Sequence, residues 1–234
     1  MHPLYKGGKT EFMRYDVDHK ERTRLRLLTD AAIMLREDGP DGISVAALMK
    51  RQGLTHGGFY AHFESKDDLI ACAIDVMFER YSERFRLRTQ GLSPLHGLLA
   101  YVAYYLSPSH YNRPGQGCPI PSVGGDVARL GSEARKRFEA GVAGMQALIA
   151  GQFAGLGFEP EDAQARAVVL MGELAGAVMM ARAVKTAAMQ KQICHATHAA
   201  VLARLGATEP AFEAGTWIEI PAEEDAATAA ASRL

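Results

Sequence analysis

The spacing of apolar residues along this chain constrains its fold more than any other feature of the sequence. Leu25, Leu28, Ala32 and Leu35 recur at steps of three or four, which places them on one face of a helix. The same spacing continues through most of the 234 residues, and residues 216–220 are the one short stretch that alternates apolar and polar side chains as a strand would. We therefore predict an all-α fold.

Capping residues, prolines and glycines divide the chain into predicted helices. We expect helices over residues 19–38, 45–51, 56–63, 66 to at least 77, 95–106, 132–155, 160–188 and 189–205. Residues 107–125 contain four prolines and four glycines and are expected to form a loop or a broken helix. This pattern predicts an N-terminal extension at 1–17, then domains at 18–65 and 66–207, and a tail at 208–234. The beginning of the extension would be either a disordered basic arm on DNA or an overlong start of the sequence.

Composition favours a soluble cytoplasmic protein. The chain is 48% hydrophobic, and at 234 residues it is long enough to bury a stable core without disulfide bonds or structural metals. Its apolar stretches are shorter than the ~20 residues that span a bilayer, and its N-terminus lacks the layout of a signal peptide. Cys72, Cys118 and Cys194 are far apart and form no CxxC motif, so we expect reduced thiols and no metal site or other cofactor.

Charge is distributed unevenly along the chain. The formal net charge is -1, but residues 209–234 hold six acidic residues and one basic residue, so the remainder is net positive. The acidic, Ala-rich composition of 208–234 is typical of a mobile tail. A small total charge predicts weak non-specific affinity for DNA.

Two short predicted helices follow a longer one and are joined at Gly53, which is the layout of a helix-turn-helix. Ser44 is suited to cap the first of them and Thr55 the second. The second contains Gly57 and Gly58, and each glycine costs a helix about 1 kcal/mol relative to Ala. The glycines are typical either of close backbone approach to DNA or of a frayed loop.

The second short helix separates apolar from polar side chains. Phe59 and Phe63 are four residues apart and are expected to anchor the helix in the core. Tyr60 and His62 point elsewhere and can donate hydrogen bonds to phosphates, and Lys66 can add an ammonium group. These side chains predict contact with a nucleic-acid backbone.

Residues 58–69, GFYAHFESKDDL, resemble the signature of the TetR family of bacterial regulators, and the similarity extends over about residues 20–75. The resemblance implies a homodimer with an N-terminal DNA-binding domain and a C-terminal helical domain for effector binding and dimerisation. It implies DNA contacts at Ser44, Thr55, His56, Gly57, Gly58, Tyr60, His62 and Lys66. Ala46 stands where some relatives have a long base-reading side chain, so specificity would depend more on His56 and on DNA shape.

The C-terminal half carries the predicted dimer interface and effector pocket. By the same resemblance, the last two long helices would pair across a two-fold axis through Leu170, Leu174, Val178, Ile193, Thr197 and Val201. This symmetry would set recognition helices about 34–36 Å apart on a near-palindromic operator. Candidate pocket residues are Tyr101, Tyr104, Tyr105, Cys118, Met145 and Met171, with ordinary core packing as the alternative for each. A hydrophobic or aromatic small molecule is the expected effector.

Other functions remain as alternatives to a repressor released by such an effector. Cys118 precedes a predicted helix, where a thiol has a lowered pKa, so it could sense electrophiles or oxidants. Cys194 and His198 share a helical face but lack a third metal ligand. An enzyme is disfavoured because the sequence contains no GxSxG, HExxH or phosphate-binding loop, and a helical interaction protein without DNA affinity is the third class.

Overall fold

The computed structural model describes residues 8–207, with side chains from residue 19 onward, and over this range it contains helices and no strand. The elements are α1 (Gly8–Gly42), α2 (Val45–Arg51), η1 (His56–Ala61), α3 (Lys66–Thr89), α4 (Pro94–Tyr105), α5 (Pro108–Tyr111), η2 (Pro114–Gln116), α6 (Pro119–Val127), α7 (Ser132–Gly155), α8 (Pro160–Ala183) and α9 (Ala187–Arg204). The predicted all-α fold is confirmed. The predicted tail at 208–234 lies outside the described residues.

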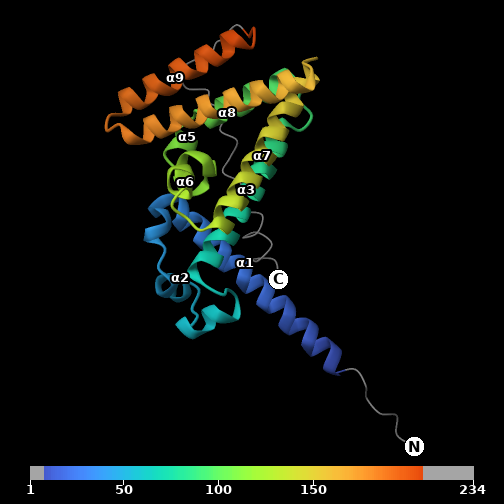
Figure 1. Cartoon of the computed structure of the whole chain (residues 1–234), viewed down its shortest axis with the longest axis vertical. Coiled ribbons are helices and arrows are strands. Elements are labelled where there is room, and N and C mark those ends of the chain that lie inside the picture. Colours follow the sequence, from blue (N-terminus) through green and yellow to red (C-terminus); the bar gives the residue numbers. More distant parts are fainter. Residues whose placement is uncertain (1–7, 208–234) are drawn as a thin grey trace, which may run out of the picture.

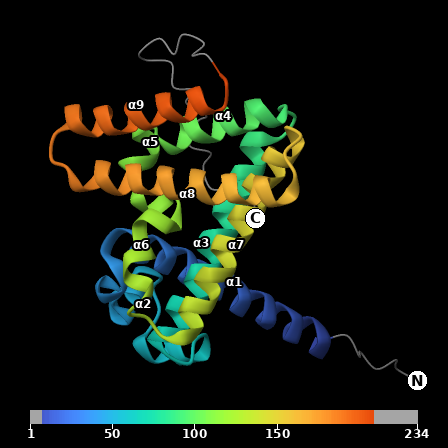
Figure 2. The ribbon, with the colours of Figure 1, turned by 45° about the horizontal axis from the view of Figure 1, so that its top comes forward.

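Helices α3 and α7 pack against each other and join two groups of helices. The α1, α2 and η1 elements form one end of the molecule, and α8 and α9 lie side by side across the other end (Figures 1 and 2). Helix α3 packs against α1 at the first end and against α7 and α4 beyond it. The α3 helix therefore belongs to both halves of the protein.

Local hydrogen bonds explain where several helices begin. Ser44 Oγ accepts a hydrogen bond from the Ala47 amide at 3.3 Å and so caps α2. Ser65 Oγ accepts from the Asp68 amide at 3.1 Å, and Asp68 Oδ2 accepts from the Glu64 amide at 3.0 Å. This reciprocal arrangement closely resembles a capping box and fixes the first turn of α3.

Three elements differ from the sequence-based expectation. Helix α1 begins at Gly8, well before the predicted start, and continues past a kink at Gly39, where φ is 73°. The segment 107–125 contains three short helices, α5, η2 and α6. Helix α8 ends at Ala183, because Val184 has an extended backbone with φ of -87° and ψ of 148°.

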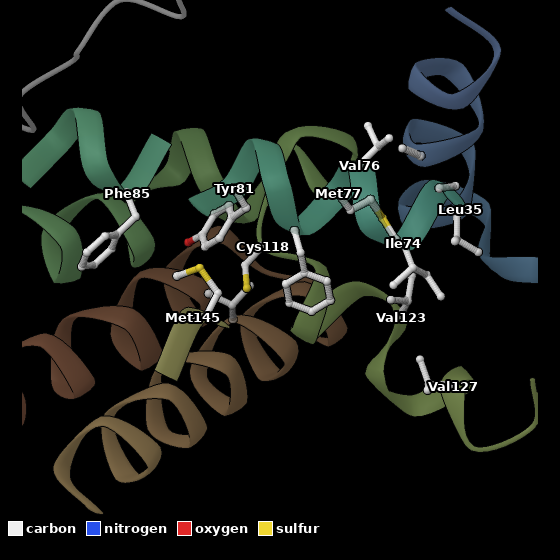
Figure 3. Close-up of a cluster of buried hydrophobic side chains, with 14 of the residues drawn as sticks. Leu35, Ile74, Val76, Met77, Tyr81, Phe85, Cys118, Val123, Val127 and Met145 are labelled. Carbon is white, nitrogen blue, oxygen red and sulfur yellow. The ribbon is translucent and has the colours of Figure 1, made fainter. Parts of the chain in front are cut away.

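The core is continuous along α3. Ile74 and Met77 on α3 are fully buried, and Val123 on α6 is buried beside them (Figure 3). Tyr81 and Phe85 extend this row of side chains toward Cys118 and Met145 (Figure 3). Burial of this row attaches α6 and α7 to the helix that begins in the N-terminal domain.

Helix α8 is the one helix of residues 8–207 that is long and apolar enough to cross a membrane, although the sequence suggested that no such stretch exists. Its most apolar window has a mean hydropathy of 1.3, and 44% of that window is buried against the rest of the protein. The core helix of a soluble protein meets the same criterion, so this is weak evidence for a membrane span.

Candidate nucleic-acid interface and ligand region

The second helix of the predicted helix-turn-helix is a 3-10 helix, η1, over His56–Ala61. The turn before it uses Gly53 at φ 68°, a backbone conformation that favours glycine. Thr55 occupies the N-cap position but its side chain makes no capping hydrogen bond, unlike that of Ser44. A missing cap and two adjacent glycines explain why the segment does not form the α-helix predicted over residues 56–63.

Aromatic packing holds η1 in place. Phe59 and Phe63 are each 2% exposed, and their ring centroids lie 5.4 Å apart. The Arg24 guanidinium of α1 lies 4.4 Å from the centroid of the Phe63 ring and also donates a hydrogen bond to the His62 carbonyl. The short helix is therefore fixed from both sides despite its poor helical propensity.

The outer surface of η1 is exposed and contains a pair of glycines. His56 and Gly57 are exposed, and Tyr60 is 69% exposed. A Cβ added at Gly57 would meet nothing within 4 Å, and one at Gly58 would make ordinary contacts of 3.5 and 3.6 Å with Met49 and Thr55. Packing within the chain therefore does not require either glycine.

His62 and Lys66 differ in how they can act on a phosphate. Burial, Lys20 and Arg24 lower the pKa of His62, so its ring is neutral at pH 7. Its Nδ1 atom is buried, which leaves Nε2 as the position from which the ring can donate. Lys66 is the first residue of α3 and is half-exposed, so its ammonium group can reach solvent.

A buried polar cluster occupies the C-terminal half. His110 Nε2 accepts a hydrogen bond from the Cys118 amide at 2.9 Å, and the His110 ring lies 4.6 Å from the Tyr105 ring. Burial, followed by the charge of Arg182, lowers the pKa of His110 to about 3, so the imidazole is neutral. Arg182 itself donates to the Tyr111 carbonyl at 3.0 Å and to Ser122 Oγ at 2.9 Å. These bonds tie α8 to α5 and α6.

The expected lowering of the Cys118 pKa is wrong. Cys118 does occupy the N-cap of α6, but it is 1% exposed, and burial raises its pKa to about 11. A hydrogen bond with Tyr105 and the charge of Arg182 act in the opposite direction and are outweighed. Desolvation of the thiolate therefore exceeds the effect of the helix terminus, and the group is a thiol at neutral pH.

The structure brings most of the predicted pocket residues together. Tyr101 and Tyr105 are each 2% exposed, with ring centroids 5.6 Å apart, and Cys118 hydrogen bonds to Tyr105. Met145 lies beside Cys118 (Figure 3), and the Arg88 guanidinium covers the Tyr104 ring at 3.5 Å. Met171 is also buried, on α8. We refer to Tyr81, Tyr101, Tyr104, Tyr105 and His110 as the aromatic cluster.

Most of the predicted dimer contacts lie inside one chain. Leu170, Leu174, Val178 and Val201 are buried in the protomer's own core, and Ile193 and Thr197 are half-buried. The sequence pattern identified the inner face of α8 because core and interface residues have the same helical spacing. The outer face of α8 exposes Val168, Val169, Met179 and Met180, with exposed fractions of 46–58%.

Sequence reasoning missed three arginines that line one small cavity. Arg36 of α1 and Arg80 and Arg84 of α3 surround a cavity of about 30 Å³, closed by residues 115–117. Arg80, Arg84 and Arg88 follow one another at four-residue steps, which places like charges side by side on a helix. This repetition of like charges disfavours a helix, and it is the feature of the sequence from which a cationic site could have been predicted. Among residues 8–207, no three His, Cys, Asp or Glu side chains gather as a metal site would require.

Comparison with known proteins places this geometry in a family. The model of "Bacterial regulatory proteins, tetR family" matches residues 27–72, and that of the "Transcriptional regulator LmrA/YxaF-like, C-terminal domain" matches residues 94–194. The chain belongs to the TetR family. It is therefore a DNA-binding transcriptional regulator of the helix-turn-helix type.

Individual relatives of this TetR-family regulator agree with that assignment. An uncharacterized HTH-type transcriptional regulator of Mycobacterium tuberculosis is 26% identical over 167 residues, covering 68% of this chain and 84% of the relative. The structure of a TetR transcriptional regulator from Chloroflexus aurantiacus is 27% identical, with a TM-score of 0.66, covering 79% of this chain and 96% of the other. The reduced form of NemR from Escherichia coli shares the fold at 22% identity, with a TM-score of 0.65 and coverage of 76% and 94%.

The low pKa of His110 predicts that the regulator loses stability in acid. Between about pH 6.5 and pH 3 the unfolded chain binds a proton at this position and the folded chain does not. The contribution of His110 to the unfolding free energy should therefore fall by roughly 1.4 kcal/mol per pH unit in this range. Urea unfolding at pH 7 and pH 5 should show a smaller acid loss for His110→Gln than for the wild type. His195→Gln, at an exposed position, is the control, and an equal acid loss in all three proteins contradicts the assignment.

The raised pKa of Cys118 predicts slow alkylation in the folded regulator. A pKa of about 11 leaves about one thiolate in 10⁴ at pH 7, and the side chain is buried as well. Iodoacetamide labelling followed by peptide mass spectrometry should modify Cys118 much more slowly in the folded protein than in urea. Equal rates in the two conditions contradict the buried-thiol description.

Proposed function

We propose that this TetR-family regulator is a homodimeric repressor that binds a near-palindromic operator and is released by a small hydrophobic or aromatic effector. It acts in the cytoplasm. The observation that carries the proposal is the pairing of an exposed η1 surface, which contains two glycines, with the buried aromatic cluster, because α3 runs from one region to the other. The first is suited to DNA, and the second to an apolar or aromatic ligand.

The DNA-binding part of the proposal rests on placement of donors around η1. Ser44 at the start of α2, Tyr60 on η1 and Lys66 at the start of α3 are exposed or half-exposed, and each of these elements is anchored by buried apolar side chains. Hydroxyl and ammonium groups in these positions suit phosphate oxygens. His56, Gly57 and Gly58 would then face the bases, and the backbone could approach them closely.

The dimer would form through the outer face of α8. Val168, Gly172, Gly176 and Met179 follow one another at steps of four, four and three, so they share a helical face. A Cβ added at Gly172 or Gly176 would meet nothing within 4 Å, which leaves room for a second helix to pack closely. Exposed valines and methionines beside the glycines would supply apolar area to an isologous contact.

Release would follow from a population shift. An effector that binds better to a conformation with displaced α3 and α1 lowers operator affinity by its coupling free energy, typically about 1–3 kcal/mol. The aromatic cluster is filled in this structure by its own side chains, so an effector would enter by moving them. The alternative of electrophile sensing at Cys118 has less support, because the thiol is buried and protonated.

Phosphate contacts by Tyr60 and Lys66 predict a uniform loss of DNA affinity when either is removed. Tyr60→Phe and Lys66→Ala should weaken binding to specific and random DNA alike, and Lys66→Ala should also reduce the slope of log affinity against log salt by about 1. Fluorescence anisotropy with an operator selected from a random library measures both effects. Lys185→Ala, exposed beyond the end of α8, is the matched control. Wild-type binding by both variants contradicts the placement of η1 on DNA.

A dimer interface on the outer face of α8 predicts that charged substitutions there give a monomer. Introducing charges with Val169→Glu and Met180→Glu should disrupt an apolar isologous contact, so light scattering should give the monomer mass and operator binding should be lost. Leu87→Glu is the control, because Leu87 on α3 is 54% exposed and lies on a different helix. A dimer that survives the double substitution contradicts the α8 interface.

A further inference from the structure

A small cationic cavity lies where the two halves of the protein meet. Arg36 and Ile33 of α1 form one wall, and Met77, Arg80, Tyr81 and Arg84 of α3 form another. Gly115, Gln116 and Gly117, around η2, close it. The walls contributed by α1 and by η2 come from the segments that match the N-terminal and C-terminal family models, so the cavity connects the DNA-binding and ligand-binding domains.

Among residues 19–207, none of the three arginines at this cavity lies within ion-pair distance of a carboxylate. Elsewhere in residues 19–207, Arg51, Arg129, Arg137 and Arg204 lie within ion-pair distance of acidic side chains, and Arg36, Arg80 and Arg84 do not. Arg80 Nη2 donates to Thr29 Oγ1 at 2.7 Å, and Arg84 Nη1 donates to the Gln116 carbonyl. Both partners are neutral, and the carboxylate of Glu37, which packs against Gly115 at the cavity wall, is not within ion-pair distance of any of the three guanidinium groups.

Arg36 is the most confined of the three. Its side chain is 8% exposed, and its buried Nε atom has no hydrogen-bond partner among the described residues. Burial, together with repulsion from Arg84 and Arg80, lowers its pKa to about 10, and nearby Glu37 opposes this only weakly. A buried guanidinium without an acceptor is costly, and an anion in the cavity would remove that cost.

The size and surroundings of the cavity indicate the class of anion. A volume of about 30 Å³ holds roughly two water-sized groups, so the cavity admits a small anionic group such as a carboxylate. Guanidinium groups bind carboxylates through paired hydrogen bonds. Tyr81 lines the cavity and also belongs to the aromatic cluster, with its ring 6.3 Å from that of Tyr105.

We propose that this cavity binds the carboxylate group of the effector, with Arg36, Arg80 and Arg84 as its cationic ligands. The organic part of the effector would then lie toward the aromatic cluster through Tyr81. A carboxylate here would draw α1, α3 and η2 together, so the effector would act directly on the helix that supports the DNA-binding domain. The role as effector rests on the proposed function, whereas carboxylate binding does not require DNA.

Thermal unfolding of the full chain with sodium acetate as the probe tests the site. Acetamide is the neutral isostere, inorganic phosphate is the larger oxyanion, and ionic strength is held constant with sodium HEPES at the same pH. Acetate should raise the Tm of the wild type, and acetamide and phosphate should not. An equal rise with acetamide, a rise with phosphate alone, or no rise with acetate overturns the proposal.

Substitution of the cavity arginines tests whether acetate binds at this site. Arg36→Met should weaken the apparent acetate affinity at least about tenfold, since a charge-assisted hydrogen bond is lost. Without acetate its Tm should equal or exceed that of the wild type, because repulsion from Arg80 and Arg84 is relieved. Arg86→Gln, an exposed arginine on α3, is the control and should respond to acetate as the wild type does.

A second variant covers the case in which Arg36→Met does not fold. Arg84→Gln removes a half-exposed guanidinium that makes one hydrogen bond to a neutral carbonyl, and it should also lose at least about tenfold in acetate affinity. Wild-type acetate affinity in either folded variant overturns the site.

Measurements of operator binding test the effector role separately from carboxylate binding at the cavity. Fluorescence anisotropy at constant ionic strength should show that acetate weakens operator binding by the wild type. The operator affinity of Arg84→Gln should be the same with and without acetate. If acetate stabilises the protein but leaves operator affinity unchanged, the effector role is overturned and the carboxylate site stands. If the wild type binds no DNA under any condition, the proposed function fails while the thermal result still decides the site.

Discussion

The continuous packing along α3 is the constraint on which the rest of the structure depends. The N-terminal end of this helix is fixed by the Ser65 cap, and its middle is buried against α1, α6 and α7 through Ile74 and Met77. Because one rigid helix belongs to both domains, neither domain can reorient without disturbing this row of side chains. Coupling between ligand and DNA can therefore act through α3, beside the direct contacts of α1 with η2 and α6.

Two arginines near the middle of the protein illustrate different uses of a buried charge. Arg182 is surrounded by acceptors from α5 and α6, and its bonds hold that irregular segment against α8. Among the described side chains and backbone, Arg36 has no such acceptor, and it shares its cavity with two more arginines. The first arrangement is complete within the chain, whereas the second remains electrostatically incomplete.

The sequence predicted elements whose signals are local. The α2, α4 and α7 helices lie almost where Ser44, Pro94 and the run from Ser132 place them, because caps and helical periodicity act over a few residues. Burial required the tertiary structure. Leu174 and Val178 have the spacing of an interface but fill the core, and Cys118 has the position of an activated thiol but is desolvated. The Arg36 cavity combines α1, α3 and η2, which no short segment reveals.

The form of η1 limits how much DNA one subunit can read. A 3-10 helix rises about 2 Å per residue, so the six residues of His56–Ala61 extend over roughly 12 Å. That length corresponds to about three to four base pairs at 3.4 Å each. With so short a reading element in each subunit, the proposed dimer would draw much of its selectivity from the distance and symmetry between two half-sites.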